Sequence, residues 1–409
     1  MNIDVYSLYV VTMTYYLLPR TYPLLYNQID YSSTPDIPDN VLSQSLSTYL
    51  YNIKEKITIK EKQWDTYKKY TNPYEYIHTC IPLKKKAVSK YKPLSRSYFK
   101  MIEIINVFNI QFREPIHTFH LAEGPGGFIE AFARTRLCND DIYIGMTLLD
   151  ENKDDSNIPA WKKSDTFLKA FPNVLIEDGQ DGTGNILSLN NFEYVVKKYP
   201  SKMDIITADG GFDFSFDFNQ QECTIGKLLF AQVAYALCLQ KHHGKFILKI
   251  FDCFMQHTID ILYLLTSFYE KVYIMKPQTS RYANSEKYII CSGFLYDNHD
   301  GFYIHLLKSF EMMSLTNENP LRFLQCKIPT LFMNKLEEYN TIFGQKQIQN
   351  IYYTLALMEN KSKYDKIDIL VKTNIEKSME WCKKYNILYN ILNNTTNIFL
   401  SNSSSHMEE

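Results

Sequence analysis

The sequence of 409 residues has little glycine and proline and no excess of either charge. It holds 14 Gly and 15 Pro, and its 44 basic and 45 acidic residues leave a formal net charge of -1. Few glycines and prolines, with 45% hydrophobic residues, exclude disorder over most of the chain. The near-zero net charge excludes a polybasic nucleic-acid binder, so any contact with nucleic acid must come from a local basic segment.

Cysteine pairs and membrane spans are also absent. The eight cysteines include no C-x-x-C pair and no histidine spacing typical of a zinc site, so we expect reduced thiols and no metal. No stretch offers the ~20 uninterrupted apolar residues of a membrane span. The apolar start, 5–18, lacks the positive charge of a signal peptide, and we interpret it as a buried helix or strand. We therefore expect an intracellular protein without membrane contact, in the cytoplasm or the nucleus, or in a viral factory or virion if its source is viral.

Three regions differ in pattern. Residues 1–83 mix tyrosine-rich apolar runs with a charged helical pattern, which we interpret as an N-terminal cap. Residues 84–299 alternate short β-branched runs with helical patterns, which is typical of a parallel sheet covered by helices. Residues 300–409 are mainly helical in pattern and end in a tail that we expect to fray. The predicted strands are 117–122, 142–147, 174–177, 204–208, 245–250, 272–275 and 287–295.

Helices are predicted from the 3.6-residue spacing of apolar side chains. The clearest is 221–241, which Gly244 is expected to end. The last region shows the same spacing at 323–336, 346–358 and 367–392. Together with the strands, these segments predict an α/β fold, with a Rossmann-like sheet of seven strands and mainly helical additions at both ends.

A glycine-rich turn is the first sign of chemistry. The sequence HLAEGPGGF at 120–128 follows a predicted strand and precedes the amphipathic segment 129–136. Glycines let the backbone approach a ligand, and amides at a helix start can bind a carboxylate or phosphate. The spacing is neither G-x-G-x-x-G nor a P-loop, which favours S-adenosylmethionine over NAD. A tight strand-to-helix turn without a ligand would use the same glycines.

Two further strands carry a charged residue near their ends. The sequence IITADGG at 205–211 is apolar until Asp209, and FILKIF at 246–251 is apolar except for Lys249. Ligands of an open α/β sheet bind beyond the carboxyl ends of the strands, so Asp209 would reach the same crevice as the glycine-rich turn. Asp209 could instead cap a helix, and Lys249 could extend its amine to solvent.

A basic segment, which we interpret as a helix, precedes the first strand of this region. Residues 84–100 contain seven basic and no acidic residues, and Tyr91 or Tyr98 could stack on bases. We expect RNA contact there, although a charge run is usually a solvated surface. Lys100 in this segment and Glu286, before the last predicted strand, complete a Lys-Asp-Lys-Glu set whose members would singly be ordinary surface residues.

The order of these motifs resembles the FtsJ-like 2'-O-methyltransferases. Lys100, AEGPGGF, TADGG, Lys249 and SEKY with Glu286 follow one another, and the four charged positions stand 109, 40 and 37 residues apart. Further matching motifs are DGTGNI at 181–186, TADGGFD at 207–213, QE at 221–222, and KPQTS and NSE within 276–286. This combination is similar to the cap-specific mRNA 2'-O-methyltransferases with an Adrift-type domain, over about residues 85–297.

The resemblance implies a Rossmann-fold enzyme that moves a methyl group from S-adenosylmethionine to the ribose 2'-hydroxyl near the 5' end of capped mRNA, without a metal. The implied catalytic residues are Lys100, Asp209, Lys249 and Glu286. Neutral Lys249 would be the base, Lys100 would favour that neutral form, and the two carboxylates would orient the lysines. The implied cofactor residues are Glu123, Gly124, Pro125, Gly126, Gly127, Phe128, Thr147, Asp178, Asp181 and Asp209. The expected RNA-binding residues are Lys84, Lys85, Lys86, Lys90, Lys92 and Arg96.

Two positions depart from the family pattern. His120 stands where many relatives have an acid, and only Thr147 and the later Asp150 follow the second predicted strand, which leaves the methionine and ribose contacts open. An rRNA or tRNA 2'-O-methyltransferase, and a non-catalytic RNA-binding subunit of a capping or polyadenylation complex, are the alternatives. The flanking regions could hold other capping or transcription proteins.

Overall fold

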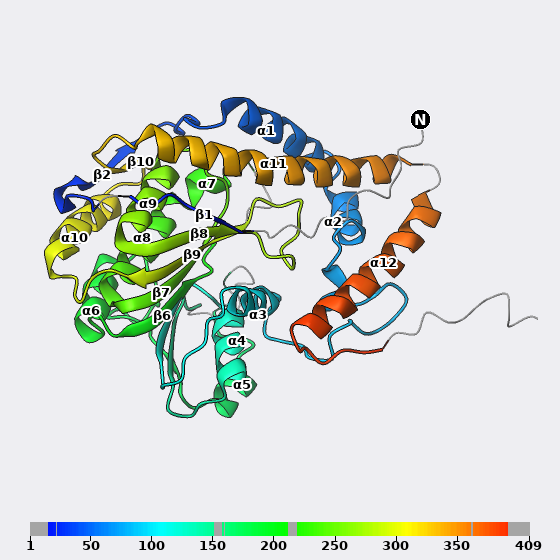
Figure 1. Cartoon of the computed structure of the whole chain (residues 1–409), viewed down its shortest axis with the longest axis horizontal. Coiled ribbons are helices and arrows are strands. Elements are labelled where there is room, and N and C mark those ends of the chain that lie inside the picture. The colour runs from blue at the N-terminus through cyan, green and yellow to red at the C-terminus, as the bar shows by residue number, and fades with distance from the viewer. Residues whose placement is uncertain are drawn as a thin grey trace, which may run out of the picture.

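The computed structural model describes residues 15–21, 23–150, 158, 160–211, 219–360 and 363–391. The strands are β1 Tyr15–Leu17, β2 Ile29–Thr34, β3 His117–Leu121, β4 Ile142–Met146, β5 Val174–Ile176, β6 Met203–Ala208, β7 Gln240–Ile250, β8 Tyr269–Met275, β9 Lys287–Phe294 and β10 Asn319–Leu324. Eight of them form a central sheet in the order β1-β8-β9-β7-β6-β3-β4-β5, and β2 and β10 pair separately (Figure 1). The predicted α/β fold and its seven strands are confirmed, and β1 adds an eighth.

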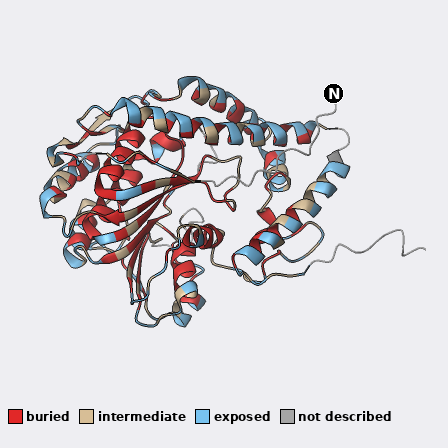
Figure 2. Ribbon diagram, in the orientation of Figure 1, coloured by how far each residue is buried: buried red, intermediate tan, exposed pale blue. Residues whose placement is uncertain are grey.

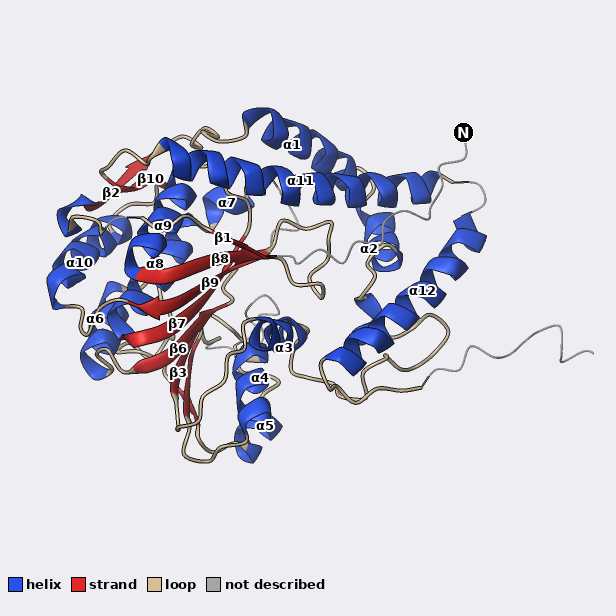
Figure 3. Cartoon of the chain, viewed as in Figure 1, coloured by secondary structure: helices blue, strands red, loops and turns tan. Residues whose placement is uncertain are grey.

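Helices cover both faces of this sheet (Figure 3). Among the described residues the α-helices are α1 Gln44–Thr58, α2 Glu61–Tyr70, α3 Ser97–Val107, α4 Gly127–Arg136, α5 Asp165–Ala170, α6 Leu189–Lys198, α7 Gln221–Thr224, α8 Gly226–Leu239, α9 Gln256–Phe268, α10 Asp300–Ser314, α11 Thr330–Glu359 and α12 Lys363–Lys384. Short 3₁₀ turns lie at Tyr26–Gln28 and Glu75–Ile77. In these described parts of the chain, no helix has the length and apolar character to cross a membrane.

The strand order creates a switch point between β3 and β6. From β3 the sheet continues in parallel through β4 and β5 on one side, and through β6 and β7 on the other. β9 runs antiparallel between β7 and β8. The loops after β3 and β6 therefore leave the sheet in opposite directions, and such a point is where open α/β sheets bind ligands. We call the side of the sheet where the parallel strands end its carboxyl edge.

Alternating strand residues divide the interior into two cores. In β7, Phe246 and Leu248 join the core formed with α6, α8, α9 and α10, whereas Ile247 joins the core formed with α3, α4 and α12. Figure 2 shows the strands and the inner sides of these helices as buried. Burial on both faces explains why the strands are apolar runs, and it makes Lys249, near the end of β7, an exception that needs a partner.

The predicted helix end at Gly244 is wrong. Helix α8 ends at Leu239, and β7 begins directly at Gln240, so Gly244 lies within the strand. A Cβ atom at Gly244 would clash with the side-chain amide of Gln240, which donates to the main-chain oxygen of Met203 at 2.8 Å. Close packing on a buried amide, and not a helix stop, explains the glycine.

The last predicted region also differs in part. Residues 319–324 form β10, paired with β2 from the N-terminal region, and α11 begins only at Thr330, after Pro329. Local spacing cannot reveal a strand whose partner lies so far away in sequence. The predicted helix 367–392 corresponds to α12 up to Lys384. Of the apolar start, 15–17 form β1 and 5–14 lie outside the described residues, as do Asp213 of the matching motif and the tail beyond 391.

Both flanking regions pack on the central one. β1 pairs with β8, and α1 and α11 lie side by side across the top of the view in Figure 1. Leu50, Ile53 and Leu355 of these two helices form one apolar cluster with Phe254, which follows β7. The domain boundaries at 83 and 299 stay a prediction. Apolar side chains from the regions on either side of each boundary pack against one another.

Candidate active site

Two loops meet at the carboxyl edge beside the switch point. His120 of β3 lies opposite Thr207 of β6, and the Nδ1 atom of His120 is 2.7 Å from the Thr207 hydroxyl. The same hydroxyl donates to the carboxylate of Glu123, in the glycine-rich turn after β3. Asp209 follows Thr207 by two residues, so strand pairing brings the glycine-rich turn beside the Asp209 loop.

Glu123 is a buried acid in this turn. The residue is 5% exposed, and its Oε2 atom accepts no hydrogen bond from a described residue, although Nδ1 of His120 lies 3.2 Å away. Burial raises the pKa of Glu123, and the neighbouring His120 opposes that rise. A buried carboxylate oxygen without a donor is costly, so Glu123 is suited to receive a cationic or hydrogen-bonding group from a ligand. A buried acid thus stands three residues after position 120, where many relatives have one.

Close packing within the protein requires the glycines of the turn. A Cβ atom on Gly126 would lie 2.9 Å from the ring of Trp161, and its φ of +104° is one that L side chains rarely adopt. A Cβ atom on Gly127 would clash with the hydroxyl of Ser97, at the start of α3. Replacement of Gly126 would therefore disturb packing as well as any bound ligand.

The other predicted cofactor residues in and beside this turn each contact a different part of the protein. The amide of Gly124 donates to the Thr147 hydroxyl at 3.4 Å, so Thr147, after β4, reaches the turn. The main-chain oxygen of Pro125 accepts a hydrogen bond of 2.6 Å from Ser164. Phe128 is buried and packs against the ring of Tyr288 at 5.7 Å between centroids, so Phe128 supports the site from the interior.

The two predicted acids after β5 have different surroundings. The Oδ1 atom of Asp181 accepts hydrogen bonds from Thr183 at 2.6 Å and from Asn191 at 2.9 Å. The Thr183 hydroxyl is the main cause that lowers the pKa of Asp181 to about 2. Asp178 is exposed, and its main-chain oxygen accepts from the amide of Gly184. Asp181 therefore fixes its own loop, while Asp178 presents its carboxylate to solvent.

The four charged residues of the predicted tetrad form two ion pairs at the carboxyl edge. The Nζ atom of Lys100 in α3 lies 2.7 Å and 2.8 Å from the two carboxylate oxygens of Glu286. The Nζ atom of Lys249 in β7 lies 3.3 Å from Oδ1 of Asp209 and donates to the main-chain oxygen of Asp209 at 2.6 Å. All four side chains are nearly buried, with exposures of 6%, 10%, 12% and 13% for Lys100, Glu286, Lys249 and Asp209.

Tyr288 joins the two pairs, and the sequence did not single it out. Its hydroxyl donates to Oδ1 of Asp209 at 2.8 Å and lies 3.3 Å from Nζ of Lys100, which donates to it. Burial raises the pKa of Tyr288 well above the ordinary value, with Asp209 contributing, so the hydroxyl keeps its proton. The signal was present, because Tyr288 follows Glu286 by two residues in an extended segment and such residues share a face.

Burial and charge act in opposition on the Lys100–Glu286 pair. Burial raises the pKa of Glu286, but Lys100, Lys249 and Arg96 outweigh it and hold this pKa well below the usual range. Burial lowers the pKa of Lys100, and Glu286 and Asp209 oppose that change. Glu286 is therefore a carboxylate at neutral pH.

The paired glycines after Asp209 let the chain pass close to other site residues. A Cβ atom on Gly210 would lie 2.7 Å from the amide oxygen of Gln232, which accepts the Gly210 amide proton. A Cβ atom on Gly211 would lie 3.3 Å from Nζ of Lys249. A side chain at Gly210 would displace the amide of Gln232, and one at Gly211 would press on the amine of Lys249, which gives the sequence DGG a physical reason.

The basic segment is a loop fixed by the C-terminal region. Only its end is helical, because α3 begins at Ser97, so the predicted basic helix is wrong for 84–96. The amide of Lys90 donates to Leu388, and the amide of Asn390 donates to Val88, each at 2.8 Å. Most of the predicted RNA-binding lysines are exposed, and Lys84 is half-buried; the exposed ones are Lys85, Lys86, Lys90 and Lys92.

The aromatic residues of this loop are not open for stacking. Tyr98 is buried, and Tyr91 donates to Glu130 while the guanidinium of Arg134 lies over its ring at 4.8 Å. Arg96 is different: it is half-buried, and its guanidinium makes no hydrogen bond or ion pair with another described residue. Its charge nevertheless lowers the pKa of Glu286, which places its guanidinium within electrostatic reach of the tetrad.

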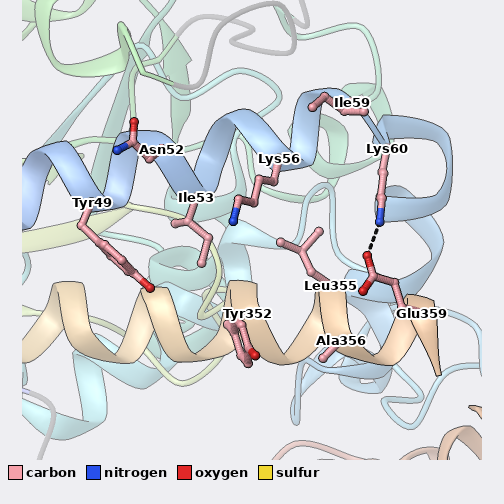
Figure 4. A pocket seen from close by; sticks show the side chains of 10 residues that line it. All are labelled: Tyr49, Asn52, Ile53, Lys56, Ile59, Lys60, Tyr352, Leu355, Ala356 and Glu359. Carbon is pink, nitrogen blue, oxygen red and sulfur yellow. Dashed lines mark hydrogen bonds and ion pairs between the residues drawn. The ribbon is translucent and has the colours of Figure 1, made fainter.

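Two cavities border the α1 region. One, of about 210 Å³, lies beside the tetrad and is lined by Lys54, Ile57, Trp64, Lys68, Gln221, Phe251, Arg281, Ala283, Asn284, Ser285 and Gln347. The other, of about 310 Å³, is a groove between α1 and α11 that includes Tyr49, Lys56 and Tyr352 (Figure 4). No tetrad residue lines that groove, so it lies apart from the candidate site.

Comparison with known families places the chain in a class. Residues 93–294 match the FtsJ-like methyltransferase family, and the chain belongs to this family through that domain.

Its relatives carry more specific names. A Trypanosoma cruzi protein named cap-specific mRNA (nucleoside-2'-O-)-methyltransferase 1 is 38% identical over 178 residues, which are 42% of this chain and 46% of that protein. The Drosophila melanogaster and Pongo abelii proteins named cap-specific mRNA (nucleoside-2'-O-)-methyltransferase 2 are 28% and 25% identical, over 50% and 80% of this chain and 30% and 43% of theirs. The chain thus spans less than half the length of these relatives. The solved structure of human methyltransferase-like protein 13 has a TM-score of 0.33 at 10% identity, and the match covers 55% of this chain and 92% of that chain.

Proposed function

We propose that this protein transfers a methyl group from S-adenosylmethionine to a ribose 2'-hydroxyl near the 5' end of capped mRNA. The observation that carries the proposal is the pair of buried lysine–carboxylate contacts joined by Tyr288 at the carboxyl edge. Family membership and the names of the relatives support the reaction class. Among the described residues, no group of three or more acidic, histidine or cysteine side chains is placed to hold a metal ion.

The residues beside the switch point fit S-adenosylmethionine. Glu123 offers a buried carboxylate oxygen without a hydrogen-bond donor, which suits the ammonium group of the methionine part. Thr147 and the exposed carboxylate of Asp178 follow the next two strands, β4 and β5, where the ribose and base would lie. When bound there, this cofactor supplies an electrophilic methyl group, and the protein has to hold the acceptor hydroxyl in line and remove its proton.

Lys249 is suited to take that proton. The main-chain oxygen and the carboxylate of Asp209 hold the amine in one place, so a hydroxyl brought to it meets a fixed acceptor once the amine is neutral. Lys100 is held by both oxygens of Glu286 and can donate to the substrate oxygen as that oxygen becomes anionic. The hydroxyl of Tyr288 bridges Asp209 and Lys100 and so fixes their relative positions.

The surroundings of the tetrad suit capped RNA. Arg96 and the exposed lysines of the 84–96 loop can pair with phosphates that lead to the acceptor ribose. The cavity of about 210 Å³ beside Glu286 combines an aromatic ring, Phe251, with side-chain amides such as Asn284. Stacking and hydrogen bonding of this kind recognise a nucleobase, so we place the cap guanine there.

Transfer of labelled methyl to capped and uncapped RNAs of one sequence, followed by nuclease mapping, tests the proposal. We expect label on a ribose near the 5' end of capped RNA. Equal labelling of uncapped RNA would indicate a structural-RNA methyltransferase. Binding of S-adenosylmethionine and RNA without any transfer would instead indicate a non-catalytic subunit.

A further inference from the structure

Both flanking regions place a buried polar side chain on the residue that precedes Glu286. Lys54 of α1 donates to the hydroxyl of Ser285 at 3.1 Å, and Gln347 of α11 donates to the same hydroxyl at 3.2 Å. Lys54 and Gln347 are each 4% exposed, and Ser285 is 2% exposed. Two regions more than 290 residues apart in sequence therefore meet on one hydroxyl next to the tetrad.

The same contact holds the loop that follows Lys249. The Ser285 hydroxyl donates to Oδ2 of Asp252 at 2.9 Å, and Nζ of Lys54 lies 3.0 Å from that oxygen. Asp252 stands three residues after Lys249 and is 5% exposed. The Lys54 contact thus joins the segments that carry two tetrad residues, Lys249 and Glu286.

Charge makes Lys54 necessary at this position. Burial raises the pKa of Asp252, but Lys54 and Lys287 outweigh it and hold this pKa below its usual value. Lys287 lies 3.7 Å from Oδ1 of Asp252, so Lys54 provides the shorter contact. A buried ion pair adds little net stability over apolar packing, but removal of one member leaves a buried charge and is strongly destabilising. A lysine in the flank is thus a requirement for the geometry of the central region.

We propose that Lys54 is a positioning residue for methyl transfer, acting through Ser285 and Asp252 on Glu286 and Lys249. The inference rests on the proposed function. Helix α1 is then part of the catalytic apparatus, because its apolar residues pack on α11 and Phe254 while Lys54 reaches Ser285. Gln347 supports the same hydroxyl and also donates to the main-chain oxygen of Ala283 at 3.1 Å.

Lys54 also lines the cavity of about 210 Å³, so a direct contact with RNA is the competing role. The two roles differ kinetically. Loss of a substrate contact raises KM, whereas misplacement of Glu286 and Lys249 lowers kcat with substrate affinity unchanged. Measured KM and kcat for capped RNA therefore separate positioning from binding.

The test uses the full chain with Lys54→Met, which keeps the side-chain length and removes the charge. We expect kcat to fall about 10- to 100-fold, since displacement of reacting groups by about 1 Å can cost as much. KM for RNA and the affinity for S-adenosylmethionine, measured by calorimetry, should stay within about twofold. Lys56→Met is the matched control, because Lys56 lies in the same helix and lines the α1–α11 groove.

A second variant separates positioning from stability. Lys54→Met with Asp252→Asn removes the uncompensated charge, so its melting temperature should return toward that of the wild type while kcat stays low. If kcat recovers fully with the melting temperature, Lys54 only stabilises the fold and the inference is wrong. A raised KM with unchanged kcat in Lys54→Met would also overturn it, in favour of RNA contact. If Lys54→Met does not fold, Gln347→Leu replaces it as the test. This variant loses a neutral hydrogen bond, so kcat should fall about fivefold at unchanged KM. An unchanged kcat would refute the inference. Wild-type protein that transfers no methyl group would refute the proposed function itself.

Discussion

Lys100 and Lys249 each lie beside a carboxylate, but the two amines differ in the number and length of their polar contacts. Lys100 lies within 2.8 Å of both carboxylate oxygens of Glu286 and also donates to Tyr288. Lys249 lies 3.3 Å from the carboxylate of Asp209 and relies on a main-chain oxygen for its shortest contact. An amine already close to two carboxylate oxygens and a hydroxyl has little room for a further partner, whereas the amine of Lys249 has fewer such contacts within the protein. Under the proposed function, this difference favours Lys249 as the group that meets the acceptor hydroxyl and Lys100 as its electrostatic support.

Replacement of Lys249 should have the largest effect. Lys249→Ala is expected to lower kcat by about 10²- to 10⁴-fold, the range associated with a general base. Lys249→Arg should fail as well, because a guanidinium cannot release its proton near neutral pH. Methyl transfer is measured under saturating S-adenosylmethionine. Lys245→Ala is the control, because Lys245 lies on the same side of β7 as Lys249. An active Lys249→Arg protein would show that Lys249 only positions the hydroxyl.

Replacement of Lys100 should cost less in rate and more in stability. Lys100→Met leaves Glu286 as an unpaired buried carboxylate, which typically destabilises a protein by about 3–5 kcal/mol. We expect a lower melting temperature and a loss of kcat of about 10²-fold through the displaced substrate oxygen. Adding Glu286→Gln should restore much of the melting temperature but not kcat. Restoration of both would show that the pair serves only the fold.

Much of this comparison could be predicted from the sequence, and its asymmetry could not. The strands, the glycine-rich turn, Asp209 and Lys249 are visible as apolar runs interrupted by a few residues, because burial on both faces leaves the carboxyl edge as the place for charge. Lys100 and Glu286 were assigned only through the resemblance to the FtsJ-like family. The identity of the partners depends on strand order. β9 lies between β7 and β8, and this arrangement brings Tyr288 to Asp209. Lys54 and Gln347 were not singled out either, because a single polar residue on an amphipathic helix gives no sign of a partner that lies 231 or 62 residues away in sequence.

Replacement of Tyr288 tests the link between the two regions. Tyr288→Phe removes the hydroxyl and keeps the ring against Phe128, so kcat should fall about fivefold, corresponding to one hydrogen bond of about 1 kcal/mol. Tyr143→Phe is a matched control, because its hydroxyl also donates to a buried acid, Asp141, beside the opposite ends of the strands. Equal rates for both variants would mean that Lys100 and Lys249 act without a link.

The smallest effect concerns the helix that carries Lys100. Glu103, one turn later in α3, accepts hydrogen bonds from Gln278 and Trp381, and burial raises its pKa to about 7 from an ordinary 4.5. Between these pH values the folded protein keeps a proton that the unfolded chain releases, so stability should fall as pH rises from 4.5 to 7. Glu103→Gln should weaken this slope. The slope should not vanish, because burial raises the pKa of Glu222 to about 7 as well.

Thermal denaturation of wild type and Glu103→Gln at about pH 5 and about pH 8 measures the effect. The variant should show a smaller drop in melting temperature across that interval. An identical drop would mean that Glu103 does not titrate in the folded protein. The charge of Glu103 in α3 would then be independent of pH.

The pairing of β1 with β8 has a consequence for the order in which the chain folds. Tyr15 pairs with Met275, so this contact closes a loop of some 260 residues. Lys54 can likewise form its contacts with Asp252 and Ser285 only after those residues have been synthesised. Contacts of such sequence separation form slowly, because loop-closure entropy must be overcome first. During synthesis the N-terminal region leaves the ribosome first, yet it can reach its final place only after β8 and β9 have emerged. Tyr15 and Tyr16 of β1 therefore stay exposed to the chaperones of the cell until these later strands have emerged.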